Sequence, residues 1–572
     1  MRYFIDHVYL FEMKRHILLY FILIIFIPIA PSQSTIGSWG DQGNGTYINP
    51  ILNADYSDPD VVRVDDRYYM VCSEFHYMGM PVLESNDMVN WRIVAQIYPR
   101  LDFPAYDNVE SYANGSWAPS IRYHDNRFWV YFCTPTEGLF MSSAEKAEGP
   151  WSPLLLVRAV EKWEDPCPLW DDDGNAYLAH SLHGAGPIIL HRMSSDGTAL
   201  LDDGYTVYTG PVAEGPKMFK RNGYYYISIP EGGVTEGWQT VLRSSNIYGP
   251  YEKRVVLESG STPINGPHQG AFVNTPEGED WFYHFQSDGP MGRVVHLQPV
   301  RWQEDWPVVG VDIDRNGVGE PVYVWKKPDT GILSSIYAPQ TDDDFDTPRL
   351  GLQWQFNHNP VDDAWSLTSH PGYLSLTALK GESFLRAKNS VTQKIMGKSG
   401  EAVTALNLTK LVKGQKTGLA SFGSMYNLIG VIAEEDGNSL FFESNQDLFD
   451  ASHRLPGARV RVNYFNTDSN YLKKIPLHGD VVYFKMQYNF STQENRFYYS
   501  SDNIHFIPFG RAFDAIFSFW KGARIALFSY NEREDGGIAQ FDWFRYAYDG
   551  PKEECRSQLS GNSICCIRHK IW

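Results

Sequence analysis

The sequence predicts an all-β protein, a five-bladed β-propeller followed by an antiparallel β-sandwich. Three observations predict this fold. An aromatic strand signature recurs through the first half of the chain, a second signature follows it at a constant offset, and the second half alternates strands with turns. The chain of 572 residues is also too long for one hydrophobic core. We expect the propeller over residues 44–335 and the sandwich over 342–549.

Residues 1–33 have the pattern of a secretory signal peptide. A basic start at Lys14 and Arg15 is followed by an apolar run and small residues, and Met13 is an alternative first residue. An uncleaved membrane anchor is the other interpretation, but the run is shorter than the about 20 residues that a spanning helix needs. We therefore expect a secreted or periplasmic protein that does not contact the membrane after cleavage.

The aromatic signature is a turn followed by a β run, and it occurs five times. It reads DDRYYMV at 65–71, DNRFWVYF at 125–132, DGNAYLAH at 173–180, NGYYYISI at 222–229 and EDWFYHF at 279–285. The spacing suits units of four short strands and is too long for a hairpin. The second signature follows the first four copies, at 84–91, 141–151, 191–197 and 242–251. Five units predict five blades, with a β-sandwich of accidental similarity as the alternative.

Charge and composition limit the class of partner. The net charge of −19 and the pI near 5.3 argue against nucleic acid and anionic membranes, which would repel the protein at long range. Aromatic residues make up 15% of the chain, which suits either edge-rich β architectures or the apolar faces of sugars. Composition leaves these two readings open, and it does not predict the oligomeric state.

A short proline-containing element precedes each aromatic strand by about ten residues. The five elements are Asp58-Pro59, Ala118-Pro119, Asp165-Pro166, Glu214-Gly215-Pro216 and Pro267-His268. The innermost strand of every propeller blade lines the central funnel, so residues at equivalent blade positions converge on one axis. Repelling charges gathered there cost stability unless a ligand or a reaction uses them. The sequence therefore predicts that Asp58, Asp165 and Glu214 form a functional cluster.

Other carboxylates near the first aromatic strand lack this phase relation. Asp55, Asp60 and Asp65 do not recur at the equivalent position of other blades. We expect them to be solvated turn or cap residues.

The chain resembles glycoside hydrolase family 43 over about residues 46–335. The resemblance is carried by NPILNADYSDPDVVRV, ESNDMVNW, SWAPSIRYHDNRFWVYF, EDPCPLWDDDGNAYLAH and EGPKMFKRNGYYYI, which are spread over all five units. It implies a five-bladed propeller that cleaves β-xylosides or α-L-arabinofuranosides with inversion. By the same resemblance Asp58 is the general base, Glu214 the general acid, and Asp165 the carboxylate that tunes the pKa of the acid.

The resemblance also implies the lining of the pocket. Trp117, Phe75, His268 and Arg293 match family residues that contact the sugar, and His268 resembles an axial histidine that in some members approaches a calcium ion. Plain packing of the blades is the alternative for the two aromatic residues. Ser120 departs from the pattern, since many arabinanases of the family have Asp there. This departure weakens an arabinanase assignment.

Inverting hydrolysis needs these residue types on chemical grounds. One carboxylic acid protonates the leaving oxygen, while a carboxylate roughly 6.5–9.5 Å away activates a water molecule. A third, ionised carboxylate beside the acid disfavours its negative charge and keeps it protonated near neutral pH. No metal or cofactor is required, although a structural calcium ion near His268 is possible by resemblance.

The second half resembles the concanavalin-like C-terminal module of the xylosidase-type branch of the family. Runs such as YLSLTAL and DVVYFKMQYNFSTQENRFYYSS alternate strands with turn residues. Such a module could bind polysaccharide, lean a loop over the funnel and shorten the pocket, or only stabilise its partner.

The six cysteines show no metal-type spacing. Cys72, Cys133 and Cys167 lie in apolar strands, where we expect small core residues. The other three fall in an atypical tail at 550–572, to which we assign no function.

Together these features predict a secreted, exo-acting, inverting glycosidase. Its expected substrates are xylo- or arabino-oligosaccharides of hemicellulose, from which it releases terminal xylose or arabinofuranose, with a slight preference for xylosides by the C-terminal resemblance. The alternative is a non-catalytic propeller that binds glycans. A fructan-acting relative is disfavoured because NDPNG and RDP signatures are missing from the sequence.

Overall fold

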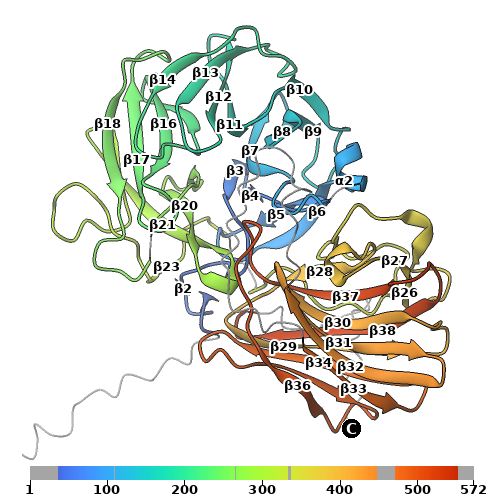
Figure 1. The fold of residues 1–572 in the computed structure, drawn as a ribbon. Coiled ribbons are helices and arrows are strands. Elements are labelled where there is room, and N and C mark those ends of the chain that lie inside the picture. Colours follow the sequence, from blue (N-terminus) through green and yellow to red (C-terminus); the bar gives the residue numbers. More distant parts are fainter. Residues whose placement is uncertain (1–36, 109, 265, 333–335, 447–470, 552–572) are drawn as a thin grey trace, which may run out of the picture. The chain divides into compact units, whose positions relative to one another are not determined.

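The computed structural model describes residues 37–108, 110–264, 266–332, 336–446 and 471–551. The proposed signal peptide and all but the first two residues of the proposed tail lie outside these ranges. The fold is all-β, with a six-bladed propeller followed by a β-sandwich, and both belong to one unit of the chain (Figure 1). The helices of the described residues are α2 (Pro104–Asn108) and three short 3-10 turns, Gly289–Met291, Asp362–Ala364 and Phe384–Arg386.

Five blades are four-stranded antiparallel meanders, each continuous in sequence. The aromatic signatures form their second strands, β4, β8, β12, β16 and β20. The first two blades are β3 (Asp60–Val64), β4 (Arg67–Val71), β5 (Gly79–Ser85) and β6 (Arg92–Tyr98), then β7 (Trp117–His124), β8 (Arg127–Thr134), β9 (Gly138–Ala144) and β10 (Leu155–Ala159). The third is β11 (Trp163–Trp170), β12 (Ala176–Leu182), β13 (Ile188–Met193) and β14 (Tyr205–Tyr208). The last two are β15 (Lys217–Arg221), β16 (Tyr224–Glu231), β17 (Trp238–Ser244) and β18 (Glu252–Leu257), then β19 (Phe272–Asn274), β20 (Asp280–Ser287), β21 (Arg293–Gln303) and β22 (Trp306–Val309).

The predicted number of five blades is wrong, because the propeller has a sixth, three-stranded sheet. It consists of β1 (Gly40–Asp41), β2 (Thr46–Ile48) and β23 (Val324–Lys326), with Thr46 opposite Lys326. Its strands come from the two ends of the propeller sequence and lack the aromatic signature. A count of repeats along the chain therefore cannot detect this sheet.

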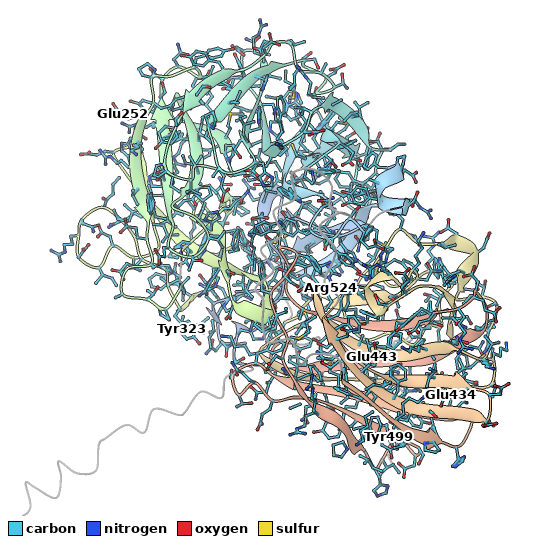
Figure 2. All side chains as sticks on the ribbon, in the orientation of Figure 1. Glu252, Tyr323, Glu434, Glu443, Tyr499 and Arg524 are labelled. Carbon is cyan, nitrogen blue, oxygen red and sulfur yellow. The ribbon has the colours of Figure 1, made fainter. Side chains whose placement is uncertain are left out.

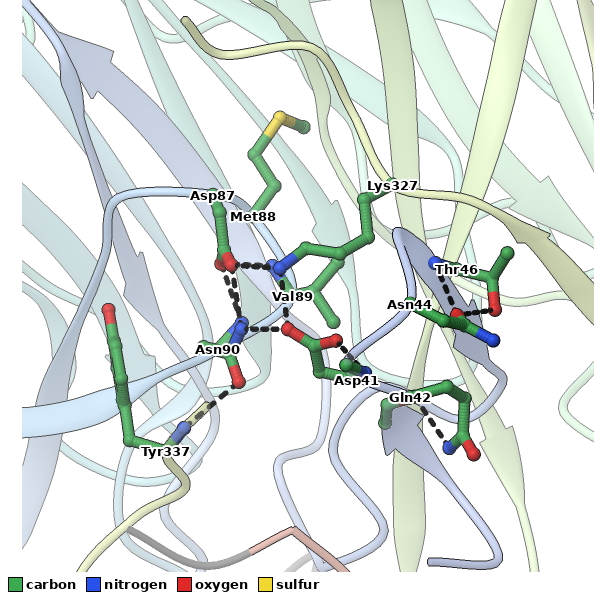
Figure 3. A network of polar contacts seen from close by, with 12 residues as sticks. Asp41, Gln42, Asn44, Thr46, Asp87, Met88, Val89, Asn90, Lys327 and Tyr337 are labelled. Carbon is green, nitrogen blue, oxygen red and sulfur yellow. Dashed lines mark hydrogen bonds and ion pairs between the residues drawn. The ribbon is translucent and has the colours of Figure 1, made fainter. Parts of the chain in front are cut away.

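A buried polar cluster fastens the sixth blade to the first (Figure 3). The Lys327 ammonium, one residue after β23, donates to Asp41 at 2.5 Å and to Asp87 at 2.6 Å. The Asn90 amide also donates to both carboxylates, at 2.7 and 2.6 Å. Because Asp87 and Asn90 lie in the turn after β5, the cluster ties both ends of the propeller sequence to the first blade.

The second half forms two sheets packed face to face. The eight-stranded sheet contains β24 (Gln355–Phe356), β27 (Leu379–Lys380), β28 (Val391–Lys394), β30 (Gln415–Phe422), β31 (Met425–Glu434), β32 (Gly437–Gln446), β33 (Tyr471–Leu477) and β37 (Arg524–Asn531). The seven-stranded sheet contains β25 (Trp365–Ser366), β26 (Leu374–Thr377), β29 (Ser399–Asn407), β34 (Val481–Asn489), β35 (Asn495–Ser500), β36 (Ile507–Phe513) and β38 (Ile538–Tyr548). Alternation along β34 buries Val482, Phe484 and Met486 in the shared core. The sheets are antiparallel except for the pairing of β27 with β37.

The propeller and the sandwich share one buried ion-pair network. Glu74, in the propeller, accepts from Arg524 at 2.7 Å and from Lys394 at 3.1 Å, and all three side chains are at least nine-tenths buried. Arg524, labelled in Figure 2, begins β37 and also bonds Gln355 and Thr392. Apolar side chains of both domains form a single cluster around this network. No helix in the described ranges is long and apolar enough to cross a membrane.

Candidate active site

A left-handed residue recurs in each of the five four-stranded blades, at the entrance to the innermost strand. The residues and their φ angles are Asp58 at 54°, Ala118 at 31°, Asp165 at 60°, Gly215 at 59° and Gln269 at 44°. For residues other than glycine this conformation costs about 1–3 kcal/mol and is concentrated at functional sites. A Cβ at position 215 would lie 2.9 Å from the Gln269 side chain, so only glycine fits there.

The recurrence defines two rings of residues at the funnel. The left-handed ring is made of Asp58, Ala118, Asp165, Gly215 and Gln269. The preceding ring holds the residue before each of these, namely Ser57, Trp117, Glu164, Glu214 and His268. Glu214 is therefore one residue out of phase with Asp58 and Asp165, and its neighbour in the next blade is His268.

Three carboxylates approach each other closely within these rings. Glu164, Asp165 and Glu214 each place one oxygen within 4.8 Å of the others. Asp58 is also near enough for its charge to act on Asp165 and Glu164. The structure thus brings the three predicted acids together and adds a fourth, Glu164.

Asp58 lies among hydrogen-bond donors. The hydroxyl of Ser57 donates to Oδ2 at 2.8 Å, and the hydroxyl of Ser73 donates to the same oxygen. The Arg293 guanidinium approaches Oδ1 at 3.5 Å, and only 3% of Asp58 is exposed. Donors and a positive charge favour the ionised form of a buried carboxyl, which suits a proton acceptor.

Asp165 has the opposite electrostatic environment. Burial and the negative charges of Glu214 and Asp58 raise the pKa of Asp165 to about 7, although a hydrogen bond from the Gly215 N–H and the charge of Lys217 oppose the rise. The Gly215 N–H donates to Oδ2 at 2.7 Å, and the Ser181 hydroxyl donates to it at 3.2 Å. Asp165 therefore exchanges a proton near neutral pH.

Glu214 contacts His268, whose Nε2 lies 2.7 Å from Oε1 of the glutamate. Burial opposes its ionisation, but the hydrogen bond to His268 and the positive charges of His268, Arg293 and His183 lower the pKa of Glu214 below its ordinary value. In the sugar-free protein a proton shared by this cluster therefore resides on Asp165 or Glu164 before it resides on Glu214. The expected effect of Asp165 on the acid is thus outweighed by His268 when no sugar is bound.

The predicted lining residues adjoin the acids. The rings of Phe75 and Trp117 are 6.1 Å apart, and the Arg293 guanidinium lies 5.7 Å from the Phe75 ring. Trp117 also packs against His183, with ring centroids 5.1 Å apart. All seven predicted site residues therefore belong to one connected group. The role of each remains a prediction.

Two residues expected to be solvated are buried, so that expectation was wrong for them. Asp60 is fully buried and accepts from Arg122 at 2.7 Å, while Asp55 accepts the backbone N–H of Arg293 at 2.9 Å. Asp60 begins β3, two residues after Asp58, so it lies further along the innermost strand than the left-handed ring does. Only Asp65 is exposed.

Lys217 was not singled out from the sequence, and it contacts Ser120. Its ammonium donates to the Ser120 hydroxyl at 2.8 Å and to the carbonyl of Pro119 at 2.7 Å, and it lies 3.8 Å from Asp60. With serine at position 120, the charge of this buried lysine acts on Asp60 and Asp165.

The sandwich contributes a loop, residues 518–523, beside the predicted lining residue Phe75, which we call the pocket wall together with Trp117. The Lys521 ammonium lies 2.8 Å from Nδ1 of His76, the residue after Phe75. The Phe519 ring stacks on Tyr112 at 4.7 Å, and the Ala523 N–H donates to Pro290, three residues before Arg293. A contact between domains that are distant in sequence leaves no local signal, so sequence reasoning could suggest such a loop but not its residues.

The residues around His268 do not form a calcium site by themselves. Nε2 of His268 bonds Glu214, and Nδ1 has no hydrogen-bond partner among the described residues. Calcium prefers six to eight oxygen ligands. Within the described ranges, the only cluster of three or more candidate metal-binding groups is the carboxylate cluster, which does not include His268. The reaction proposed below uses no metal ion.

A propeller funnel with buried carboxylates in contrasting electrostatic environments, next to an aromatic wall, has the features of a glycoside hydrolase. Comparison with known proteins agrees. Residues 47–307 match glycosyl hydrolases family 43, and residues 342–547 match the beta xylosidase C-terminal concanavalin A-like domain. The chain belongs to glycosyl hydrolases family 43.

Relatives cover most of the chain. A protein of Xylanibacter ruminicola named as a beta-xylosidase is 51% identical over 488 residues, which span 85% of this chain and 87% of the relative. The "Beta-xylosidase" of Formosa agariphila is 37% identical over 92% of this chain and 94% of its own. The crystal structure of the GH43 protein BlXynB from Bacillus licheniformis superposes with a TM-score of 0.74 at 27% identity, covering 88% of this chain and 99% of that one.

Proposed function

We propose that this glycosidase is exo-acting and inverting, and that it removes terminal xylose from β-1,4-linked xylo-oligosaccharides. The observation that carries the proposal is the contrast between Asp58, surrounded by donors, and Asp165, whose pKa is raised to about 7 and which lies beside Glu214. Inversion needs one carboxylate that accepts a proton and one group that donates a proton.

In the proposed reaction Glu214 donates its proton to the leaving glycosidic oxygen. Asp58 accepts a proton from the water molecule that attacks the anomeric carbon from the opposite face. The glycosidic carbon–oxygen bond breaks as the bond from the water oxygen forms, so a free sugar of inverted configuration and a shortened oligosaccharide leave the site. Above its raised pKa of about 7 Asp165 is ionised, and its negative charge then disfavours ionisation of Glu214.

The pocket wall supports exo action. Phe75 and Trp117 supply an apolar surface for one sugar ring, and the contact of Lys521 with His76 brings the sandwich to the same wall. We propose that this contact closes the site on one side, so that the site admits the end of a chain.

Xylosides are proposed over α-L-arabinofuranosides because two relatives that are 51% and 37% identical, over 85% and 92% of the chain, are named as beta-xylosidases. A relative from Bacteroides ovatus, named as a non-reducing end alpha-L-arabinofuranosidase, is 30% identical over 64% of this chain. We retain arabinofuranosides as second substrates. Secretion stays a prediction from residues 1–33.

The test is hydrolysis of an aryl β-xyloside, an aryl α-L-arabinofuranoside and xylobiose, with the anomer of the first product followed by NMR. We expect α-xylose to appear first and kcat/KM to favour the xyloside. Initial release of β-xylose would refute inversion. A tenfold preference for arabinofuranoside would reverse the substrate assignment, and binding without turnover of any pentoside would indicate a non-catalytic propeller.

A further inference from the structure

Glu164 occupies the same blade position as three of the predicted site residues. It lies in the preceding ring with Trp117, Glu214 and His268, and only Ser57 completes that ring. Glu164 is not part of an aspartate–proline pair, because it is the residue immediately before Asp165. Its register alone places its backbone at the funnel.

The side chain of Glu164 lies within the carboxylate cluster. One of its oxygens is within 4.8 Å of oxygens of Asp165 and Glu214, and 7% of the residue is exposed. Oε1 has no hydrogen-bond partner among the described residues, and the backbone N–H of Ala185, which donates to the carbonyl of Leu182, is near enough to act on this carboxyl. A buried carboxyl beside other carboxylates with one unpartnered oxygen favours the protonated form.

The groups that face Glu164 support the same conclusion. Burial, then the charges of Asp165, Glu214 and Asp58, raise the pKa of Glu164 to about 10, and the Ala185 N–H opposes the rise. The buried Cys133 thiol is close by as well. The nearby positive charges act on its neighbours: Lys217 on Asp165, and His268 and Arg293 on Glu214.

We propose that Glu164 is a positioning residue, a neutral carboxylic acid that donates its O–H into the carboxylate cluster and holds Asp165 and Glu214 in place. The proposal rests on the roles proposed above for those two residues. A neutral donor orders carboxylates by a charge-assisted hydrogen bond without adding another negative charge to the funnel.

Glutamine separates this role from that of an ionised glutamate, because its amide is nearly isosteric and cannot ionise. We expect Glu164→Gln to keep kcat on xylobiose within about threefold and to leave both limbs of the pH profile in place. Glu164→Ala should lower kcat by about tenfold or more with little change in KM, because it removes the donor. Asp165→Asn is the matched control, because it removes an adjacent charge and should lower the alkaline limb.

An alkaline limb that falls in Glu164→Gln as it does in Asp165→Asn would show an ionised Glu164 and overturn the proposal. Equal activity of the Ala and Gln variants would remove the positioning role. Infrared spectroscopy of the folded protein gives a readout independent of activity. At about pH 9, where Asp165 has lost its proton, a protonated-carboxyl band should be present in the wild type and disappear in Glu164→Gln, and its persistence would contradict the assignment. If the wild-type enzyme turned over no pentoside, the proposed function would fail, and this band would still decide the state of Glu164.

Discussion

The ammonium of Lys521 in the sandwich lies 2.8 Å from Nδ1 of His76 in the propeller, next to the wall residue Phe75. Burial and the positive charges of Arg524 and Lys394 lower the pKa of Lys521 well below its ordinary value, despite Glu74 and Asp55 nearby. The pKa of His76 is lowered as well, mainly by burial. The two groups share one hydrogen bond, and this bond fixes the sandwich loop next to Phe75.

Removing this bond should impair catalysis through the pocket wall. We expect Lys521→Ala to reduce kcat/KM on xylobiose by about tenfold, because His76 loses its donor and Phe75 loses support. The matched control is Lys413→Ala, also in the sandwich, where the lysine is half exposed and pairs with exposed Glu435. Equal kinetics of the two variants would mean that the loop does not shape the pocket.

The acid and the base should respond differently to the leaving group. Glu214→Ala should slow cleavage of xylobiose by ~10² to 10⁴-fold but retain far more activity on an aryl xyloside with an acidic phenol, which needs little protonation. Asp58→Ala should be crippled on both, since water must be activated in either case. Steady-state kinetics on the two substrates checks this. A uniform loss in Glu214→Ala, or an active Asp58→Ala, would contradict the assigned roles.

Asp165→Asn should shift the alkaline limb of the pH profile downward. The substitution removes a negative charge beside Glu214, which favours ionisation of the acid and lowers its pKa. Profiles of kcat/KM between pH 4 and 9 on xylobiose, whose leaving group needs protonation, would show the shift. An unchanged limb would mean that Asp165 does not act on the acid.

The same substitution should stabilise the fold above neutral pH. Burial and neighbouring charges raise the pKa of Asp165 to about 7, so the folded state binds more protons than the unfolded state between the ordinary aspartate pKa and that value. Stability contributed by this group therefore falls as the pH rises through this window. We expect Asp165→Asn to raise Tm at pH 8 and to have little effect near pH 4. A lower Tm at pH 8 would contradict this sign.

Glu74 should be essential for joining the two domains. Glu74→Ala leaves Arg524 and Lys394 buried without their partner, which costs about 3–5 kcal/mol, whereas Glu435→Ala at the exposed pair should cost about 0–1 kcal/mol. Denaturant unfolding of both variants measures the difference. Similar midpoints would show that the network contributes little.

The stability that Glu74 contributes should decrease at acid pH. Burial alone would raise the pKa of Glu74, but the charges of Lys394 and Arg524 lower it below its ordinary value. The stability that it contributes is therefore present above the ordinary glutamate pKa and is lost as the pH falls toward the lowered one. Acid unfolding of wild type should be steeper than that of Glu74→Gln.

The aromatic repeat predicted the second strand of every four-stranded blade, and the phase of the aspartate–proline pairs predicted a real convergence. Asp58 and Asp165 share one ring because a left-handed residue before proline repeats at the entrance of four of the five four-stranded blades. Glu164 precedes Asp165 and Glu214 precedes Gly215, so the residues one position before the left-handed ring also recur in the sequence. The phase argument could not find the sixth blade, because Thr46 and Lys326 pair across the whole propeller sequence.

The burial of polar side chains was the property that the sequence predicted least well. Asp60 looks like a turn carboxylate in the sequence, yet Arg122 and Lys217 from two other blades compensate it in the interior. The contact of Lys521 with His76 depends on how two domains dock. Both are tertiary effects that a single local stretch does not encode.

The three-stranded sheet determines how much of the sequence is needed to encode a closed propeller. Since β23 and Lys327 come after the fifth aromatic unit and pair with the start of the propeller, a gene fragment cut at the last repeat would encode an open ring. The smallest segment that recombination could move between proteins with its closure intact runs from about Gly40 to Lys327. Evolutionary exchange of this catalytic domain should therefore carry the connecting strand with it.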